Sequence, residues 1–208
     1  MKKLFVIGLG LMLSTAALTT KAQNMDAKIG IKAGGNLMMG GKFEVGGASY
    51  TSKYTAGFQA GVFLDLPLSE RLSFIPEVMY AQKGSKFEGS VSGTNGEIRT
   101  KTGYIDIPVL LAINATPELQ FVLGPQASLL LNQKTTTYVN GQSIGSTTDK
   151  DDFRKSIAGG VVGLGYKFNP NMNINARYNM DFQSFGKDNI DQDKARFSGF
   201  ALSLGYSF

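Results

Sequence analysis

Four charged residues in this 208-residue chain stand where ion pairing is the expected chemistry: Lys32, Glu77, Asp106 and Arg177. Their immediate neighbours are apolar or aromatic, and two positive charges match two negative ones. An isolated ion in an enclosed interior is costly, so such charges either pair with one another or keep water around them. We hypothesise that the four form an ion-paired network that closes a narrow interior. Unconnected charges with separate water shells are the alternative.

The composition removes most other chemistry. The chain contains no His and no Cys, which excludes a Ser-His-Asp triad, a Cys-His pair and a thiol nucleophile. The usual zinc and transition-metal sites lose their main ligands for the same reason, and we expect neither a metal nor a cofactor. We therefore predict that the protein is not an enzyme, with an Asp-based hydrolase acting through Asp106 as the remaining alternative. Acidic runs over 149–152 and 188–193 match no EF-hand loop and indicate calcium only weakly.

Residues 1–22 have the features of a secretory signal peptide: two lysines, an apolar stretch over 4–18 and a small-x-small cleavage site over 20–22. An uncleaved N-terminal anchor is the alternative. After cleavage, residues 23–208 carry 18 basic and 16 acidic side chains, a net charge of +2. Such a small surplus gives no support for nucleic-acid binding.

The rest of the chain alternates between apolar and polar residues with a period of two, which is typical of β-strands. No apolar run reaches the roughly 18 residues of a transmembrane helix. The alternating segments are about ten to fourteen residues long, whereas a tilted transmembrane strand needs about 9–11 and soluble strands average about 5–6. The eight segments cover residues 26–37, 54–66, 72–81, 104–113, 119–131, 158–168, 174–182 and 199–208.

Short and long connections alternate strictly between these segments. An eight-stranded antiparallel barrel of the outer membrane has this rhythm, with short periplasmic turns, long outer loops and both chain ends in the periplasm. The sequence therefore predicts an all-β, eight-stranded antiparallel transmembrane β-barrel of the outer-membrane type as the one domain of residues 23–208. The tight connections are 67–70, 116–118 and 169–171, and the long ones are 38–53, 84–101, 132–154 and 185–196.

The two faces of each segment differ in side-chain size as well as in polarity. One face carries Leu, Ile, Phe and Tyr, and the other is rich in Gly, Ser and Gln. A soluble lipid-carrying barrel would point its apolar face inward around a ligand, but eight strands enclose too little volume for so many large side chains. We therefore predict that the apolar face meets lipid and that the small polar face lines the interior, in a closed barrel without a free strand edge.

Three prolines, Pro76, Pro108 and Pro125, lie inside predicted strands, where they cannot donate a ladder hydrogen bond. Each marks a β-bulge, which would exchange the inward and outward faces locally, or stands where the lost bond is tolerated. The sequence leaves both interpretations open.

The long loops are expected to be solvated and variable. Residues 138–144 are a separate case, because Asn140 and Gly141 form a favoured hairpin turn between β-branched and aromatic residues. We predict that this hairpin extends two strands beyond the membrane.

The C-terminal segment 200–208 ends on Phe208 after apolar residues at every second position. With Leu204, Tyr206 and Phe208 on the outward face, it resembles the signal that the barrel-insertion machinery of bacterial outer membranes recognises. The segments IGIKAG (29–34), PEVMY (76–80), YIDIP (104–108), GVVGLG (160–165) and YSF (206–208) occur in an order that carries a wider resemblance. The whole mature chain resembles the porin-like, PorT-related outer membrane β-barrel family common in Bacteroidetes-type bacteria. The resemblance implies the fold and a location in the Gram-negative outer membrane, and only weakly a transport role.

Three functions compete on this basis: a closed barrel with a structural or surface-interaction role through its long extracellular loops, a small-solute diffusion pore, and a membrane-embedded hydrolase. We favour the closed barrel because eight strands leave an interior that side chains fill, whereas aqueous channels need about 16–18 strands. Expected partners are outer-membrane lipid, lipopolysaccharide and the insertion machinery, and no nucleic acid. The partner of the loops and the oligomeric state are left open, although a barrel without a free edge can exist as a monomer.

Overall fold

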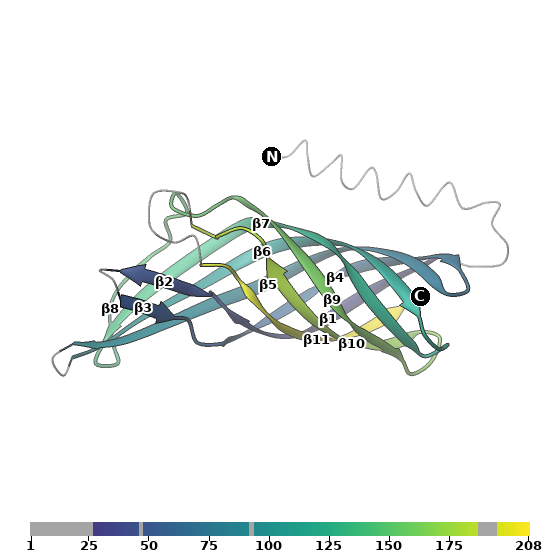
Figure 1. The fold of residues 1–208 in the computed structure, drawn as a ribbon, viewed down its shortest axis with the longest axis horizontal. Helices are drawn as coiled ribbons and strands as arrows, with labels where there is room; N and C mark the ends of the chain where they lie inside the picture. Colours follow the sequence, from purple (N-terminus) through teal and green to yellow (C-terminus); the bar gives the residue numbers. More distant parts are fainter. Residues whose placement is uncertain (1–26, 46–47, 92–93, 187–194) are drawn as a thin grey trace.

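The computed structural model describes residues 27–45, 48–91, 94–186 and 195–208. Eight strands close into one antiparallel ring, in which β1 pairs with β4 on one side and with β11 on the other (Figure 1). The predicted eight-stranded antiparallel barrel is therefore confirmed. The described residues contain no helix of the length and hydropathy needed to cross a membrane. The ring consists of β1 (Lys28–Met39), β4 (Thr55–Ser69), β5 (Leu72–Val91), β6 (Thr94–Asn114), β7 (Leu119–Val139), β9 (Ser156–Lys167), β10 (Met172–Asp181) and β11 (Ser198–Ser207).

Three further strands lie at one end of the barrel, which we call the hairpin end (Figure 1). A hairpin of β2 (Lys42–Val45) and β3 (Ala48–Thr51) and a single strand, β8 (Gln142–Thr147), which pairs with β7, make up this set. The opposite end, with the short turns and the C-terminus, is called the short-turn end. The predicted hairpin over 138–144 is confirmed, and its turn residues Asn140 and Gly141 adopt φ values of 47° and 82°.

Strands β5, β6 and β7 continue far beyond the predicted segments, to 20, 21 and 21 residues. The prediction of a loop over 84–101 is wrong, because β5 and β6 stay paired up to Val91 and Thr94. Where both faces of a sheet meet water, the apolar alternation that reveals a strand disappears while the backbone ladder continues. The Thr-rich composition of 100–102 and 135–137 was the remaining strand signal.

The barrel wall has the predicted orientation of its two faces. Ile31, Val162 and Leu202 expose 51%, 57% and 56% of their surface on the outside. On the other face, their chain neighbours Lys32, Val161 and Ser203 are almost completely buried. Large apolar side chains are also exposed on the other side of the ring, as at Phe58 on β4, Ile113 on β6 and Phe121 on β7, so the apolar surface surrounds the barrel. Such a surface is suited to hydrocarbon, and a closed ring leaves no backbone edge in it.

The three prolines stand without bulges. The shifts of register in the described ladders lie between Pro67 and Ser69, at Gly103 and Tyr104, and at Thr137 and Tyr138. The inward and outward faces therefore keep their alternation, and the lost hydrogen bonds are tolerated in place. Within the unshifted ladders Pro76 faces Val109, Pro108 faces Gln126 and Pro125 faces Gly160.

Candidate functional site

Glu77 lies in the lumen between two cations from other strands. The ammonium of Lys32 on β1 donates to Glu77 Oε1 at 2.5 Å. The guanidinium of Arg177 on β10 binds the same carboxylate with both ends, Nη1 to Oε2 at 2.7 Å and Nη2 to Oε1 at 2.8 Å. Glu77 is completely buried, and the other two side chains are nearly so. The sequence hypothesis named all three residues, and the structure brings them together; we call them the first charged layer.

Small residues on the inner face make room for this layer. A methyl group at Gly163 on β9 would lie 2.4 Å from the carbonyl oxygen of Ala176 and 2.8 Å from Cγ of Arg177. At Gly30 on β1 it would lie 2.4 Å from the ring of Phe63. The ring of Phe63 in turn lies 4.9 Å below the ammonium of Lys32. The inward glycines therefore allow the long charged and aromatic side chains to fill the lumen.

Asp106 belongs to a second charged layer instead. It pairs in register with Met79, two residues beyond Glu77 on β5, so it lies one inward position nearer the hairpin end. Its carboxylate is 3.4 Å from the ammonium of Lys83, which is also 3.4 Å from Asp181. Lys83 further donates to Ser128 Oγ at 3.1 Å. The four named residues thus form two ionic groups, and Asp106 is the one that stands apart.

Lys83 and Asp181 were missed as site residues. Lys83 follows the predicted end of its strand at residue 81, although continuing the inward alternation from Glu77 by odd numbers reaches it. Asp181 lies on the same inward face as Arg177, four residues further along β10. The charges of the two layers complement each other, since the first carries two cations and one carboxylate and the second carries one cation and two carboxylates.

An aromatic cap covers the second layer on its hairpin side. The ring of Tyr104 lies 4.8 Å from the ammonium of Lys83 and 6.2 Å from the ring of Phe197. Phe197 stacks on Phe185 at 4.7 Å, and Phe185 stacks on Phe153 at 5.9 Å. These phenylalanines come from the connections on either side of β9 and β10. They pack into the barrel mouth, whereas the sequence predicted only solvated loops there.

Apart from the aromatic cap, a cluster of buried apolar side chains fills part of the lumen nearer the short-turn end. The predicted inner face was polar and small, so this cluster corrects that expectation in part. Its members are Phe63, Ile75, Leu110, Ala112, Val122 and Val161.

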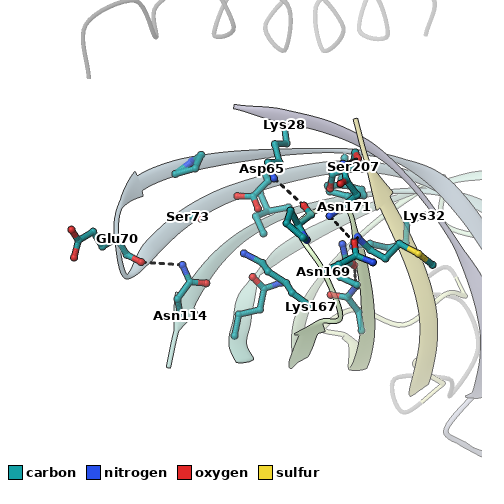
Figure 2. Close-up of a pocket in the computed structure, with 18 of the residues that line it drawn as sticks. Lys28, Lys32, Asp65, Glu70, Ser73, Asn114, Lys167, Asn169, Asn171 and Ser207 are labelled. Atoms are coloured by element: carbon teal, nitrogen blue, oxygen red, sulfur yellow. Dashed lines mark hydrogen bonds between the residues drawn. The ribbon is translucent and has the colours of Figure 1, made fainter. Parts of the chain in front are cut away.

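At the short-turn end the lumen opens into a vestibule of about 320 Å³, lined mainly by polar side chains (Figure 2). Hydrogen bonds tie its rim together: Lys28 Nζ donates to the carbonyl of Pro170 at 2.9 Å, and Asn171 Nδ2 to that of Ser207 at 2.8 Å. Lys32 and Arg177 line its inner end. The vestibule therefore stops at the first charged layer.

Among the residues that the structure describes, no group of three or more acidic side chains is placed to hold a metal ion. In the run 149–152, the Asp149 carboxylate accepts a hydrogen bond from the backbone N–H of Asp151 and so stabilises a local turn. The acidic run 188–193 and the predicted signal peptide over 1–22 lie outside the described residues.

The comparison with known families decides the identity of this barrel. A family model described as the outer membrane protein beta-barrel domain matches residues 21–185. The chain belongs to this family. It is therefore a β-barrel protein of the bacterial outer membrane, and the apolar outer surface is its lipid-facing surface. No curated protein matches the sequence.

A solved outer-membrane barrel has the same fold at low sequence identity. Ail, the attachment invasion locus protein of Yersinia pestis, in complex with the heparin analogue sucrose octasulfate, is 18% identical with a TM-score of 0.50, over 88% of this chain and 100% of that one. Neisserial surface protein A is 17% identical with a TM-score of 0.48, over 88% and 100% of the two chains. The likeness to Ail concerns the fold alone.

In this outer-membrane barrel the predicted C-terminal signal lies on the lipid-facing surface. Leu204, Tyr206 and Phe208 are all exposed on the outside, and the rings of Tyr206 and Phe208 meet edge to face at 5.3 Å. The family match concerns the general barrel domain, so the PorT-related branch stays a prediction.

Proposed function

We propose that this protein is a closed barrel that acts at the cell surface through the sheet at its hairpin end. The observation that supports a closed lumen best is the complete burial of Glu77 between Lys32 and Arg177. The second charged layer and the aromatic cap lie above it. A solute crossing the barrel would have to displace both ionic groups, each of which would then leave unpaired ions in a narrow interior.

The surface role rests on the strands that rise from the barrel rim. The extensions of β5, β6 and β7, together with β8, form one continuous sheet beyond the apolar surface (Figure 1). β8 is exposed along its whole length and carries no charged residue. Among the described strands it pairs only with β7, so its outer edge offers backbone donors and acceptors to a partner.

The orientation in the membrane is part of this proposal. We place the hairpin end outside the cell and both chain ends in the periplasm, as is usual for barrels with short turns on one side and long loops on the other. The signal peptide over 1–22 and the recognition of the C-terminal strand by the insertion machinery fit this route. We also retain the PorT-related, Bacteroidetes-type assignment, a monomeric state and the absence of catalysis as expectations.

Cysteine labelling tests the surface location directly, because the chain has no native cysteine. A membrane-impermeant maleimide should label an Asn140→Cys variant in intact cells. The matched control is Asn169→Cys in a short turn, which should react only after the outer membrane is permeabilised. If the control but not Asn140→Cys is labelled in intact cells, the barrel has the opposite orientation in the membrane.

The diffusion-pore alternative draws on the vestibule, which is open to the short-turn end. It requires a continuous path, whereas the vestibule ends at Lys32 and Arg177. A steady single-channel conductance of the reconstituted protein would support the pore instead.

A further inference from the structure

Two lysines face each other on the outer surface of the barrel wall. Lys101 on β6 and Lys134 on β7 are direct cross-strand partners in the register of the sheet. Both side chains are exposed. Directly opposed side chains of an antiparallel pair stand about 4.5–5.5 Å apart at their Cβ atoms, where like charges destabilise the sheet. We call these two residues the rim lysine pair.

The other cations on this face of the sheet have carboxylate partners. Further toward the hairpin tips, Lys86 pairs with Glu88 at 2.7 Å and with Glu97 at 3.0 Å. Arg99 pairs with Glu97 at 2.7 Å. No ion pair within the described part of the chain engages either member of the rim lysine pair. The sheet therefore neutralises its upper cations and leaves two lysines together without an anion.

The rim lysine pair lies at the border of the lipid-facing surface. Following the outward positions down the two strands leads to Ile105 on β6 and to the exposed Leu131 on β7. Three or four residues of strand span roughly 10–13 Å at about 3.3 Å per residue, and less along the membrane normal because the strands tilt. Long lysine side chains at this height reach the headgroup region that flanks the hydrocarbon core.

Polar groups gather just below the pair, on the same face. A methyl group at Gly103 would lie 2.9 Å from the Tyr80 hydroxyl and 2.8 Å from Asn132 Oδ1. Gly103 therefore gives space for these two side chains between Ile105 and Lys101. A tyrosine with its ring on the apolar side and its hydroxyl on the polar side is typical of a membrane interface.

We propose that the rim lysine pair binds a phosphate group of a lipid in the outer leaflet, with the Tyr80 hydroxyl and the Asn132 amide as neighbouring hydrogen-bonding groups. Lipid A is the lipid that suits this leaflet, and its phosphate supplies the anion that the two lysines lack. Lysine ammonium groups bind phosphate as point charges and need no fixed approach. The choice of leaflet rests on the proposed function, because it assumes that the hairpin end lies outside the cell.

A soluble sulfated glycan is the competing ligand, because it carries the same kind of charge. The position of the pair favours the lipid. The lysines point sideways from the barrel wall at the edge of the apolar surface, whereas a soluble polymer would meet the hairpin tips first. The cations near the tips already have carboxylate partners, as the ion pairs of Lys86 and Arg99 show.

The experiment compares lipid A binding by the full-length mature protein and two double variants, in detergent micelles, with native mass spectrometry. Lys101→Gln/Lys134→Gln removes the pair. Lys42→Gln/Lys155→Gln removes two other exposed lysines at the same end and is the matched control. Both double variants should fold, since surface changes usually alter stability little, and circular dichroism confirms the barrel in each sample.

Lipid A with both phosphates should bind the Lys101→Gln/Lys134→Gln variant roughly 30-fold more weakly than the parent protein, from about tenfold per 1.4 kcal/mol and about 1 kcal/mol per lysine. The control should keep its affinity, and dephosphorylated lipid A should bind the parent as weakly as phosphorylated lipid A binds the variant. Equal losses in both variants, or equal binding of dephosphorylated lipid A, would overturn the proposal. So would sucrose octasulfate binding that requires the pair while lipid A binding does not. Labelling at Asn140→Cys decides the orientation independently of these affinities.

Discussion

Glu77 and Arg177 are 100 residues apart in the chain and form a two-pronged ion pair across the lumen, with N–O distances of 2.7 and 2.8 Å. β5 and β10 lie on opposite sides of the ring. The pair therefore connects opposite walls of the barrel, and Lys32 on β1 adds a third point of attachment. One carboxylate accepts hydrogen bonds from both cations, so it is the residue on which the first charged layer depends.

Removing the charge of Glu77 should destabilise the barrel strongly. A Glu77→Gln substitution leaves the Lys32 and Arg177 cations together without a carboxylate, and breaking a buried pair costs about 3–5 kcal/mol. Urea unfolding of the protein in lipid vesicles, followed by circular dichroism, measures the loss. Glu70→Gln in an exposed turn should change the free energy of unfolding by no more than about 0.5 kcal/mol. Equal effects of the two substitutions would show that the first layer contributes nothing specific.

The second layer should tolerate a paired change better than a single one. Lys83→Gln leaves Asp106 and Asp181 facing each other without a cation, which should cost about 3–5 kcal/mol near neutral pH. Adding Asp181→Asn should restore part of the loss at neutral pH. An additive double variant in the same unfolding assay would argue against direct coupling.

Gly163 should be intolerant of a side chain. Gly163→Ala places a methyl group 2.4 Å from the carbonyl oxygen of Ala176, and overpacking of this kind costs about 1–3 kcal/mol. Gly145→Ala on β8 is the matched control, because no atom lies within 4 Å of the added methyl group. The free energy of unfolding should fall only in the first variant. A lower free energy of unfolding in Gly145→Ala alone would contradict this prediction.

The C-terminal residue should matter for assembly in cells more than for stability. Phe208→Ala removes the terminal aromatic ring of the proposed insertion signal, and we expect less folded protein in the outer-membrane fraction. Refolding of the purified variant into detergent should proceed as for the parent. Phe182→Ala, another exposed outward aromatic, serves as the control. If both variants lose the same amount of folded protein from the outer-membrane fraction, the effect comes from general contact with lipid and not from an insertion signal.

The parts of this molecule that meet lipid could be predicted because their sequence has to alternate. Ile31 and Lys32 illustrate this, since one must be apolar and its neighbour must fit inside. Lys83 could not be placed as easily, because its strand leaves the membrane soon afterwards and both faces then accept polar residues. The apolar alternation in the sequence ends at Ala81, whereas the strand itself continues to Val91.

The division of the charges into two layers could not be predicted from the sequence either. Residue counts from the predicted strand ends place Asp106 slightly nearer the hairpin end than Glu77, but which charges meet depends on strand tilt and on cross-strand register. Phe185 and Phe197 were hidden for a different reason. They belong to a connection without periodicity, and only the folded chain brings them over Tyr104 at the barrel mouth.

Single-channel recording of the purified, refolded protein in a planar lipid bilayer tests the closed lumen most directly. Insertion is verified on the same preparation by flotation with lipid vesicles. The parent protein should insert and show no steady conductance, because two buried ionic layers and an aromatic cap fill the barrel. A steady open channel from inserted parent protein would contradict this account of the lumen.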